Sequence, residues 1–560
     1  MFVRVKTTPN SPRKSVQIVE SMRKGSSVTQ KIVRYVGIAL DDEELGQLRI
    51  LAEAIKEKME QQARPSLFAP DELDRMKKHS VQQRTLESLN ADEQNFTVKL
   101  KAMKEEARVI DGIHEAYGAL YDQMDFSKLF TMRKKRSGEI FREMVLARLA
   151  SAKSKLATVE MLQRDYGVRL NVEAVYRMLD QVDDDLIEKL KKTAYTQTKK
   201  LFGDNLDVIF FDATTLYYES FMEDEFRKNG FSKDLKFNQP QILLALMVTQ
   251  DGLPVGYELF SGETYEGHTL IPCLTKLREK YQITRVIFVA DSGLFNEENL
   301  VALEAANFEY IVGARLKSQT KAITANILAT EQYQQLGESL RIKEFEHKHG
   351  RLIVSHSASR AKKDAFDREK AINKLIKRLR KNGTINAKEL LSNTGHKKFL
   401  KVEGDGVLVL DQDKIKTEAQ WDGLHGIITN SKNTNHFELL EQYKQLWQVE
   451  DAFRLQKHDL KIRPIFHFKE RRIKAHVAIL FAAFSLAKYM QHRVKLQHRS
   501  MSVDKIKEAL LSVQSSIYYY PPKGFRYCVP GRLYFDAQKI YQILGISQNR
   551  TVKIIAQEKV

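Results

Sequence analysis

The chain has 560 residues, which is too long for one ordinary domain and predicts three or four folded units. Hydrophobic residues make up 42% of it, enough to build cores, which argues against wholesale disorder. Lys and Arg total 91 against 72 Asp and Glu, and the resulting net charge of +19 favours a polyanionic partner such as nucleic acid over a merely basic protein.

The two cysteines, Cys273 and Cys528, are far apart and have no metal-ligand spacing. They argue against a disulfide scaffold or a zinc site and fit a reducing cytoplasm. The N-terminal residues lack the apolar core of a signal peptide. The longest apolar stretch, 477–486, reads as a buried helix and is shorter than the roughly 20 residues of a membrane span. We therefore expect a cytoplasmic protein with no membrane partner.

The first part of the chain, 1–105, is predicted to be an N-terminal DNA-binding region. Residues 1–40 alternate apolar and polar residues, which predicts a small antiparallel sheet. A helix is expected from Asp41, and the charged stretch 60–105 is expected to be a linker or an exposed helix. The polar face of the sheet would carry Lys6, Arg23, Lys31 and Arg34. Such a face fits phosphate contact and ordinary solvation equally well.

Residues 106–204 are predicted to form a helical region. The segment TVEMLQRDYGVRLNVEAVYRMLDQV places a glycine between two short helices. This spacing resembles a helix–turn–helix, which would bind a DNA end, but it also occurs in plain helical hairpins.

From 205 the pattern becomes that of a mixed α/β sheet. NLDVIFFDATTLYYES predicts a strand too apolar for a sheet edge, and QILLALMVTQDGLPVGYELF predicts a hairpin around an Asp-Gly turn. A helix, the buried strand TRVIFVADSGLF, a helix capped by Asn296 and the strand EYIVGARLK follow. This order predicts that 205–316 is the first part of a ribonuclease-H-like core, not a strictly alternating doubly wound sheet.

The remaining segments complete the predicted division. Short β runs flank a very basic helical stretch in 317–435, which predicts a β-rich insertion subdomain. A long helix over about 437–460 and a buried one over about 470–490 predict the second part of the core at 436–495. Residues 496–560 are mixed and basic, and we expect a C-terminal region that is a candidate for dimerisation.

Two aspartates stand beside buried strand segments. Asp212 follows two phenylalanines within one strand, and Asp291 ends another. In open α/β sheets, active sites form where strands give way to loops. A carboxylate next to an apolar strand is costly unless something pairs with it, and Mg²⁺ takes such oxygen ligands. One such aspartate alone would more often be a cap or turn residue, whereas two in matching contexts favour a metal site.

Glu450 is the third candidate ligand. It lies at a seven-residue spacing from Tyr443 and from Lys457, so one continuous helix would place the three side chains on one face. A surface stripe of salt bridges would show the same spacing. Three carboxylates around two cations suit phosphodiester chemistry, in which one metal activates the attacking water or 3′-hydroxyl and the other stabilises the leaving oxygen. The sequence has no Gly-rich phosphate loop, which argues against an ATPase.

These features resemble the DDE transposases of bacterial insertion sequences, in particular the insertion-sequence-4-like group. The signature of that group is Tyr, two residues, Arg, three residues, Glu, six residues, Lys. Tyr443, Glu450 and Lys457 match it, whereas Leu446 stands at the Arg position. Further similar segments are FFDATTLYYES, GFSKDLKFNQPQILLALMVTQDGLPVGYELFSGET, VADSGLF, DGLHGIITN and RRIKAHVAILFAAFSLAKY. The resemblance spans about 205–490 and, loosely, 1–40.

The resemblance implies a fold and an active site. The fold would be α/β, a ribonuclease-H-like mixed sheet with a β-rich insertion, preceded by a small β-containing N-terminal region and a helical region. Asp212, Asp291 and Glu450 would be catalytic and would bind Mg²⁺ or Mn²⁺, as two ions. Tyr443 and Lys457 would contact phosphates of the transposon end.

The resemblance also suggests further DNA contacts. Arg454, one turn beyond Glu450, is our candidate to replace the missing arginine. Trp421 would hold a distorted or flipped base, with core packing as the plainer alternative. Other candidate DNA-binding residues, which would otherwise be ordinary surface charges, are Lys233, Lys236, Arg315 and Lys317.

The implied function is that of an enzyme that binds the terminal inverted repeats of an insertion sequence, cuts double-stranded DNA there and joins the strands to target DNA. A homodimer holding two ends is expected, acting at the nucleoid. Two alternatives remain: a ribonuclease-H-like nuclease that cleaves without joining, and a non-catalytic DNA-binding relative. The presence of all three carboxylates argues against the second.

Overall fold

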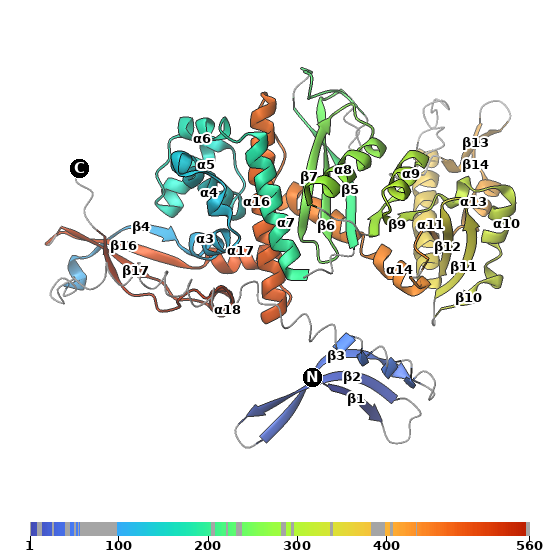
Figure 1. Ribbon diagram of the computed structural model, residues 1–560, viewed down its shortest axis with the longest axis horizontal. Helices are drawn as coiled ribbons and strands as arrows, with labels where there is room; N and C mark the ends of the chain where they lie inside the picture. Colours follow the sequence, from blue (N-terminus) through green and yellow to red (C-terminus); the bar gives the residue numbers. More distant parts are fainter. Residues whose placement is uncertain are drawn as a thin grey trace.

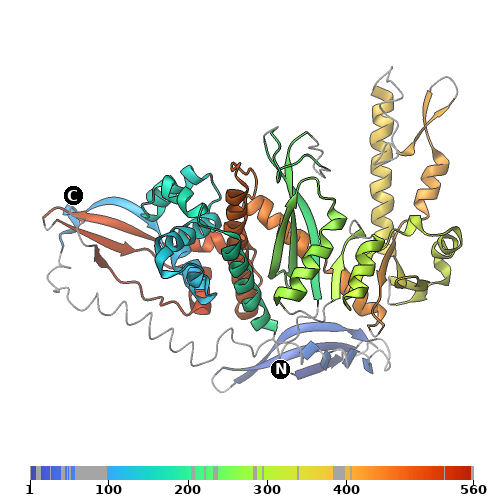
Figure 2. The same cartoon turned by 45° about the horizontal axis from the view of Figure 1, so that its top comes forward.

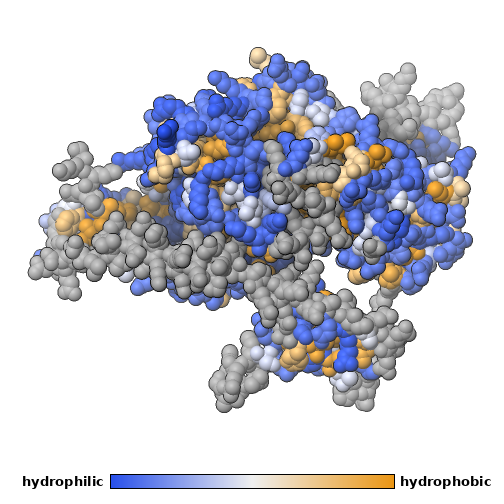
Figure 3. All heavy atoms as spheres, in the orientation of Figure 1, coloured by the Kyte–Doolittle hydropathy of each residue, from blue (hydrophilic) through white to orange (hydrophobic). Residues whose placement is uncertain are grey.

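The computed structural model describes residues 2–7, 14–24, 27–39, parts of 45–56, 98–202, 208–219, 222–230, 238–281, 287–292, 296–336, 340–381, 398–403, 407–432, 434–522 and 524–555. Figure 1 shows a small N-terminal sheet, a helical body with a narrow second sheet, and a large sheet covered by helices. Hydrophilic residues dominate the face seen in Figure 3, and hydrophobic residues form scattered patches on it.

The large sheet has mixed strand directions. Its strand order is β10-β11-β12-β15-β9-β8-β5-β6-β7. Its first five strands along the chain are β5 (Val208–Tyr217), β6 (Gln241–Thr249), β7 (Pro254–Ser261), β8 (Ile287–Ala290) and β9 (Glu309–Gly313). β5, β8 and β9 run parallel, whereas β6 and β7 form an antiparallel hairpin, with Gly252 in its turn at φ +72°. The predicted mixed α/β class and the interior position of β5 are thus confirmed.

Most strands of 317–435 extend the core sheet, and only β13 (Leu400–Glu403) and β14 (Val407–Leu410) pair apart from it among the described strands of this range. β15 (Leu424–Thr429) pairs antiparallel with β9, and β12 (Gly350–Ser357) pairs with β15, so the core sheet continues through them. The edge is formed by β11 (Leu340–His347) and β10 (Gln334–Gln335). The basic helix α11 (Ala358–Lys381) rises away from this sheet beside the hairpin of β13 and β14, as Figure 2 shows in yellow and orange.

Helices cover both faces of the sheet because its strands are apolar on both sides. In β5, Phe211 points to the face covered by α8 (Leu270–Tyr281) and α9 (Glu297–Ala305). Phe210 points to the opposite face, whose core includes residues of α7 (Asp184–Phe202), α15 (Trp447–Arg454) and α16 (Glu470–Gln497). The smaller helices on the sheet are α10 (Lys321–Leu328) and α13 (Gln412–Ala419).

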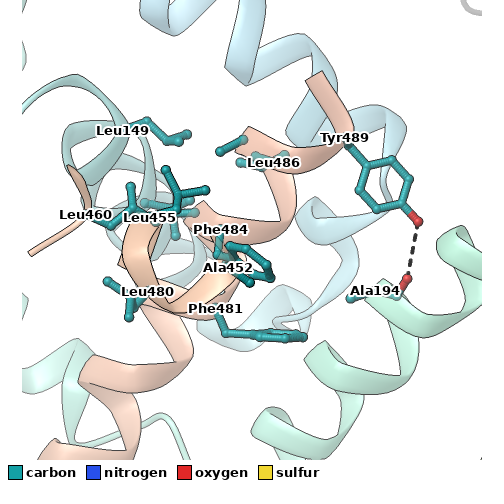
Figure 4. Close-up of a cluster of buried hydrophobic side chains, with 14 of the residues drawn as sticks. Leu149, Ala194, Ala452, Leu455, Leu460, Leu480, Phe481, Phe484, Leu486 and Tyr489 are labelled. Carbon is teal, nitrogen blue, oxygen red and sulfur yellow. Dashed lines mark hydrogen bonds between the residues drawn. The ribbon is translucent and has the colours of Figure 1, made fainter. Parts of the chain in front are cut away.

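The central helix α16 joins the helical region to the sheet. Figure 4 shows Leu480, Phe481, Phe484 and Leu486 among residues of neighbouring elements, with the Tyr489 hydroxyl donating to the carbonyl oxygen of Ala194 at 3.5 Å. Among the described residues α16 alone is long and apolar enough to cross a membrane, but 94% of its apolar window is buried inside the protein. Its composition is therefore explained by its place in the core.

The prediction of one long helix over 437–460 is wrong, because this segment forms two helices and a π-helical turn. α14 (His436–Lys444) ends before Gln445, α15 begins at Trp447, and the chain then widens into the π-helical turn η11 (Leu455–Asp459). At the break, the amide of Leu446 donates to the carbonyl of Tyr443 only three residues back. Leu446 is buried there, so the break lets both helices place apolar residues in the core.

The described part of the predicted helical region, 106–202, is mainly helical apart from its first residues. The helices are α3 (Gly118–Gln123), α4 (Lys135–Ala150), α5 (Lys155–Tyr166), α6 (Val172–Leu179) and α7. Gly167 ends α5 at φ +67°, and Asn171 caps α6, as the predicted helix–Gly–helix pattern requires.

The boundary expected at residue 105 cuts through a strand. β4 (Lys104–Ile110) pairs with β16 (Gln514–Tyr520) in a four-stranded sheet with β17 (Phe525–Pro530) and β18 (Lys553–Ile555). The C-terminal segment adds α17 (Val503–Leu511) and α18 (Phe535–Leu544), both of which contact α16. Partners distant in sequence decide such pairing, so local patterns at 104–110 did not show it.

The N-terminal sheet has the predicted antiparallel form. It consists of β1 (Phe2–Thr7), β2 (Lys14–Lys24) and β3 (Ser27–Ala39). Lys6, Lys31 and Arg34 are exposed, whereas the side chain of Arg23 lies outside the described residues. Residues 57–97 of the expected linker also lie outside them. Cys273 and Cys528 are free, as expected.

The buried packing of α16 generates a prediction about stability. Replacing the fully buried Phe484 by Ala leaves a cavity, so we expect the free energy of unfolding to fall by about 3–5 kcal/mol. Leu496→Ala, at an exposed position of the same helix, should change it by less than about 0.5 kcal/mol. Urea denaturation followed by tryptophan fluorescence measures both. Equal effects of the two substitutions would contradict the central position of α16.

Candidate active site

Asp212 and Asp291 occupy matching positions on adjacent parallel strands. Phe210 of β5 pairs with Val289 of β8, and each aspartate follows two residues later on its strand. Neighbouring strands lie about 4.8 Å apart, so the two backbones are close where the carboxylates emerge.

Both aspartates belong to the face of the sheet that α15 covers. Side chains alternate along a strand, and Phe210 and Val289 both contribute to the core shared with α15 and α16. Asp212 and Asp291, each two residues further on, therefore point to the same side. Both are half-buried, and Asp212 Oδ1 accepts a hydrogen bond from the amide of Ala213 at 2.8 Å.

The broken helix brings the residues of the Tyr-Glu-Lys spacing onto this face. Val449 and Phe453 of α15 are buried against the sheet, which leaves Glu450 exposed beside them. In η11, Lys457 Nζ donates to Thr214 Oγ1 at 2.6 Å, and Thr214 lies two residues beyond Asp212 on β5. Lys457 is thereby fixed along the strand that carries the first aspartate.

Tyr443, on α14, lies next to the ends of the neighbouring strands β8 and β9. A Cβ atom placed on Gly313 would lie 2.5 Å from the Tyr443 hydroxyl and 3.0 Å from the amide nitrogen of Ser292. The His425 ring of β15 contacts the Tyr443 ring at 5.0 Å between centroids. Only a glycine at 313 lets the hydroxyl come this close to the strand end that follows Asp291.

Charges around Tyr443 connect the elements of the site. Burial, together with the negative charges of Asp291 and Glu450, raises the pKa of Tyr443 to about 12, against the opposing charge of Arg360. Burial and the charge of Arg360 lower the pKa of His425 to about 4. At neutral pH both rings are therefore uncharged, and Asp291, Glu450 and Arg360 all lie within electrostatic range of Tyr443.

The carboxylates suit a divalent cation in chemistry but do not yet enclose one. Oxygen ligands are those that Mg²⁺ and Mn²⁺ prefer, and Asp212 with Asp291 offers two of them on one face. Within the described ranges, however, no three Asp, Glu, His or Cys side chains come close enough to hold a metal ion. Glu450 thus lies on the same face as the two aspartates but is not close enough to them to complete a metal site.

Two arginines flank this group. Arg315, just beyond β9, donates from Nε and from its terminal nitrogen to the carbonyl oxygen of Ser292 at 3.2 and 3.0 Å. Arg360, in the first turn of α11, is 53% exposed and lies 3.7 Å from Asp364. Arg454 is directed elsewhere, because it donates to Asp451 at 2.5 Å and is exposed.

Trp421 lines a cavity of about 560 Å³ next to the site. Lys317 lies 5.5 Å from the centre of its ring and donates to Glu418 at 2.7 Å. The cavity also contacts Phe399, Lys398 and Arg368, and its wall combines aromatic rings with paired charges, because Lys398 pairs with Glu418 and Arg368 with Asp422. Trp421 is partly buried against the core cluster as well, and packing therefore accounts for part of its position.

The structure thus brings Asp212, Asp291, Glu450, Tyr443 and Lys457 to one face, with Arg315 beside them. Lys233 and Lys236 lie outside the described residues. Sequence reasoning missed Thr214, Arg360, His425 and Gly313. Thr214 could have been found from its even spacing to Asp212 on a strand, whereas Arg360 reaches the site only through the fold of α11 against β15.

The close approach at Gly313 generates a second prediction. Gly313→Ala should lower the free energy of unfolding by about 1–3 kcal/mol, because the new methyl group would overlap the Tyr443 hydroxyl. Adding Tyr443→Phe should recover most of this loss. Gly256→Ala is the matched control, since its new Cβ would meet only Met247, at 3.5 Å. A double-mutant cycle by chemical denaturation measures the coupling, and additive effects would contradict the contact.

Comparison with known proteins adds independent findings. A family model described as the transposase DDE domain matches residues 203–486, which is half of the chain, and one described as the N-terminal domain of IS1634 family transposases matches residues 2–69. A solved structure, the Mos1 transposase paired-end complex with left transposon end, is 15% identical, with a TM-score of 0.14. That match covers 31% of this chain and 56% of the Mos1 chain. A search of curated proteins gave no match.

The DDE-domain match begins before β5 and ends within α16, so it contains the large sheet, both aspartates and the helices with Tyr443 and Glu450. The chain therefore belongs to the DDE transposases, and its N-terminal match indicates a transposase of an insertion sequence.

Proposed function

We propose that this transposase binds the terminal inverted repeats of its insertion sequence, cleaves the DNA there and joins the freed strand to target DNA. The observation that carries the proposal is the matched pair Asp212 and Asp291 on adjacent parallel strands, facing the helix with Glu450. The order of strand, hairpin and two further parallel strands supports a ribonuclease-H-like core, with 317–435 as an insertion that extends its sheet. Its likeness to the insertion-sequence-4-like group rests on Tyr443, Glu450 and Lys457.

We assign Asp212, Asp291 and Glu450 as ligands of two divalent cations, Mg²⁺ or Mn²⁺. Such cations, when bound, supply activation of the attacking hydroxyl and stabilisation of the leaving oxygen. Tyr443 stays protonated at neutral pH and can donate a hydrogen bond to a phosphate oxygen near Asp291. Lys457, positioned by Thr214, adds a positive charge on the other side of Asp212.

Arg360 is our candidate for the cation that the signature lacks at Leu446. Leu446 is buried in the core, so a side chain at that position does not reach the DNA. Arg454 is paired with Asp451, whereas Arg360 is half exposed and acts electrostatically on both Tyr443 and His425. With Arg315 it forms a basic border along the strand ends next to the carboxylates.

The cavity at Trp421 is proposed to receive a displaced base. The aromatic ring of Trp421 gives a stacking surface for such a base. The protein would act as a homodimer that holds two transposon ends together, in the cytoplasm at the nucleoid.

The carboxylate assignment is tested by single substitutions. Asp212→Ala, Asp291→Ala and Glu450→Gln should each lower cleavage of a labelled inverted-repeat end by about 100-fold or more, because each removes a ligand of the cations that stabilise charge on the reacting phosphate. Binding of the end, measured by gel shift, should stay close to that of the unmodified protein. Glu441→Gln, an exposed glutamate of α14 paired with Lys444, is the control.

Substantial cleavage by one of the three variants would remove that residue from the catalytic set. Adding a target plasmid and Mg²⁺ to the same reaction separates the two enzymatic functions. Joined product supports strand transfer, whereas cleavage without joined product under these conditions would favour the nuclease.

The role of Arg360 is tested by salt dependence. Arg360→Ala should weaken end binding by about 10- to 100-fold, because it removes one charged hydrogen bond to phosphate. The slope of log K against log salt concentration should fall by about one. Arg454→Ala should change neither quantity by a comparable amount. Equal effects of the two substitutions would contradict the assignment.

A further inference from the structure

The segment 460–469, which directly follows η11, presents two phenylalanines to solvent. Its inward positions are Leu460, Ile462, Ile465 and His467, all of them buried. Between them, Phe466 and Phe468 are 67% and 64% exposed. From Ile465 to Phe468 buried and exposed side chains alternate, so the buried ones hold the two phenylalanines outward.

Buried basic side chains fix the backbone of this segment. Arg148 donates to the carbonyl oxygen of Leu460 at 3.5 Å, and His476 Nε2 donates to that of Ile462 at 3.3 Å. Lys155 Nζ in turn donates to His476 Nδ1 at 3.1 Å. Burial lowers the pKa of His476 well below its usual range, so its ring is neutral and can accept this bond. The two phenylalanines therefore project from a well-anchored backbone.

The surroundings of the phenylalanines are basic. Lys461 and Lys469 are exposed on the same segment, and Arg463 lies 4.4 Å from the centre of the Tyr217 ring. Arg227 lies 5.2 Å from the centre of the Phe468 ring. Between 461 and 472 the sequence has five Lys or Arg and a single acidic residue, Glu470. Exposed aromatic rings among cations are the features of a surface that binds unpaired nucleotides, through stacking of bases and attraction of phosphates.

The segment lies along the strand that carries Asp212. Lys457, just before it, contacts Thr214, and Arg463 contacts Tyr217, the last residue of β5. From Asp212 to Tyr217 is five residues of strand, about 16 Å. That distance corresponds to about five nucleotides along one DNA strand.

We infer that Phe466 and Phe468 form a stacking platform for unpaired nucleotides of the transposon end, beside the far end of the strand that carries Asp212. The inference rests on the proposed binding of DNA ends and adds a preference for strands that are opened next to the active site. The surface is formed by the segment that comes after the Glu450 helix in the chain, and it is separate from the cavity at Trp421.

The test compares two DNA probes in equilibrium binding by fluorescence anisotropy. One is a duplex with the inverted repeat that flanks the gene, and the other is identical except for a short run of unpaired thymines beside the scissile position. The full-length protein should bind the unpaired probe more tightly. Phe466→Ala and Phe468→Ala should each weaken binding of that probe by about 5- to 150-fold and leave the paired probe nearly unaffected.

Conservative variants and a control make the result specific. Phe466→Trp should keep the preference for the unpaired probe, whereas Phe466→Leu, which is apolar but cannot stack, should lose it. Phe366→Ala, at a phenylalanine of α11 that is 63% exposed, should have no effect. Thermal denaturation confirms that each variant is folded.

Three outcomes would overturn the inference. Equal binding of both probes by the unmodified protein would refute the stacking platform and leave the proposed binding of transposon ends intact. Failure of the protein to bind either probe would refute both proposals. If Phe466→Leu bound the unpaired probe as tightly as the unmodified protein does, stacking would be excluded. Loss of a DNA-free dimer in Phe466→Ala would assign the surface to a second protein chain instead.

Discussion

Two carboxylates emerge at matched positions from neighbouring parallel strands, and the rest of the site is arranged around them. The pairing of β5 with β8 fixes Asp212 and Asp291 on one face, and buried apolar residues on both strands prevent them from moving apart. Positive charge must balance them, and Lys457, Arg315 and Arg360 are arranged on their borders. A divalent cation would complete this balance, which is why the pair favours metal-dependent phosphoryl chemistry.

The helices around the two aspartates position the side chains of Tyr443 and Glu450 next to them. They can do so because the helices and the sheet share one continuous core. α16 packs against the helical region on one side and against the sheet on the other, so the segments before and after the DDE-domain match share one core. The break at Gln445 and Leu446 matters for the same reason. It orients α14 so that Tyr443 reaches Gly313, while α15 keeps Val449 in the core and Glu450 outside it.

Local patterns predicted much of this arrangement. The hairpin turn at Gly252, the cap at Asn296 and the buried strand before Asp212 depend on neighbouring residues, and the structure has them as expected. The helix at 437–460 was wrong because seven-residue spacing cannot reveal where a helix breaks to bury a leucine. β4 was missed because its partner strand begins about 400 residues later in the chain.

The sequence by itself determined which residues are candidates for the chemistry, because acidic residues beside apolar strands and the Tyr-Glu-Lys spacing are visible along the chain. It also predicted the order of strands and helices within 205–316, which follows from local periodicity. The tertiary structure decided which cations face those carboxylates: Arg360 approaches Tyr443, whereas Arg454 pairs with Asp451. It likewise decided that Phe466 and Phe468 stand exposed on an anchored segment. Both outcomes depend on contacts between segments far apart in sequence, whose distances no local pattern encodes.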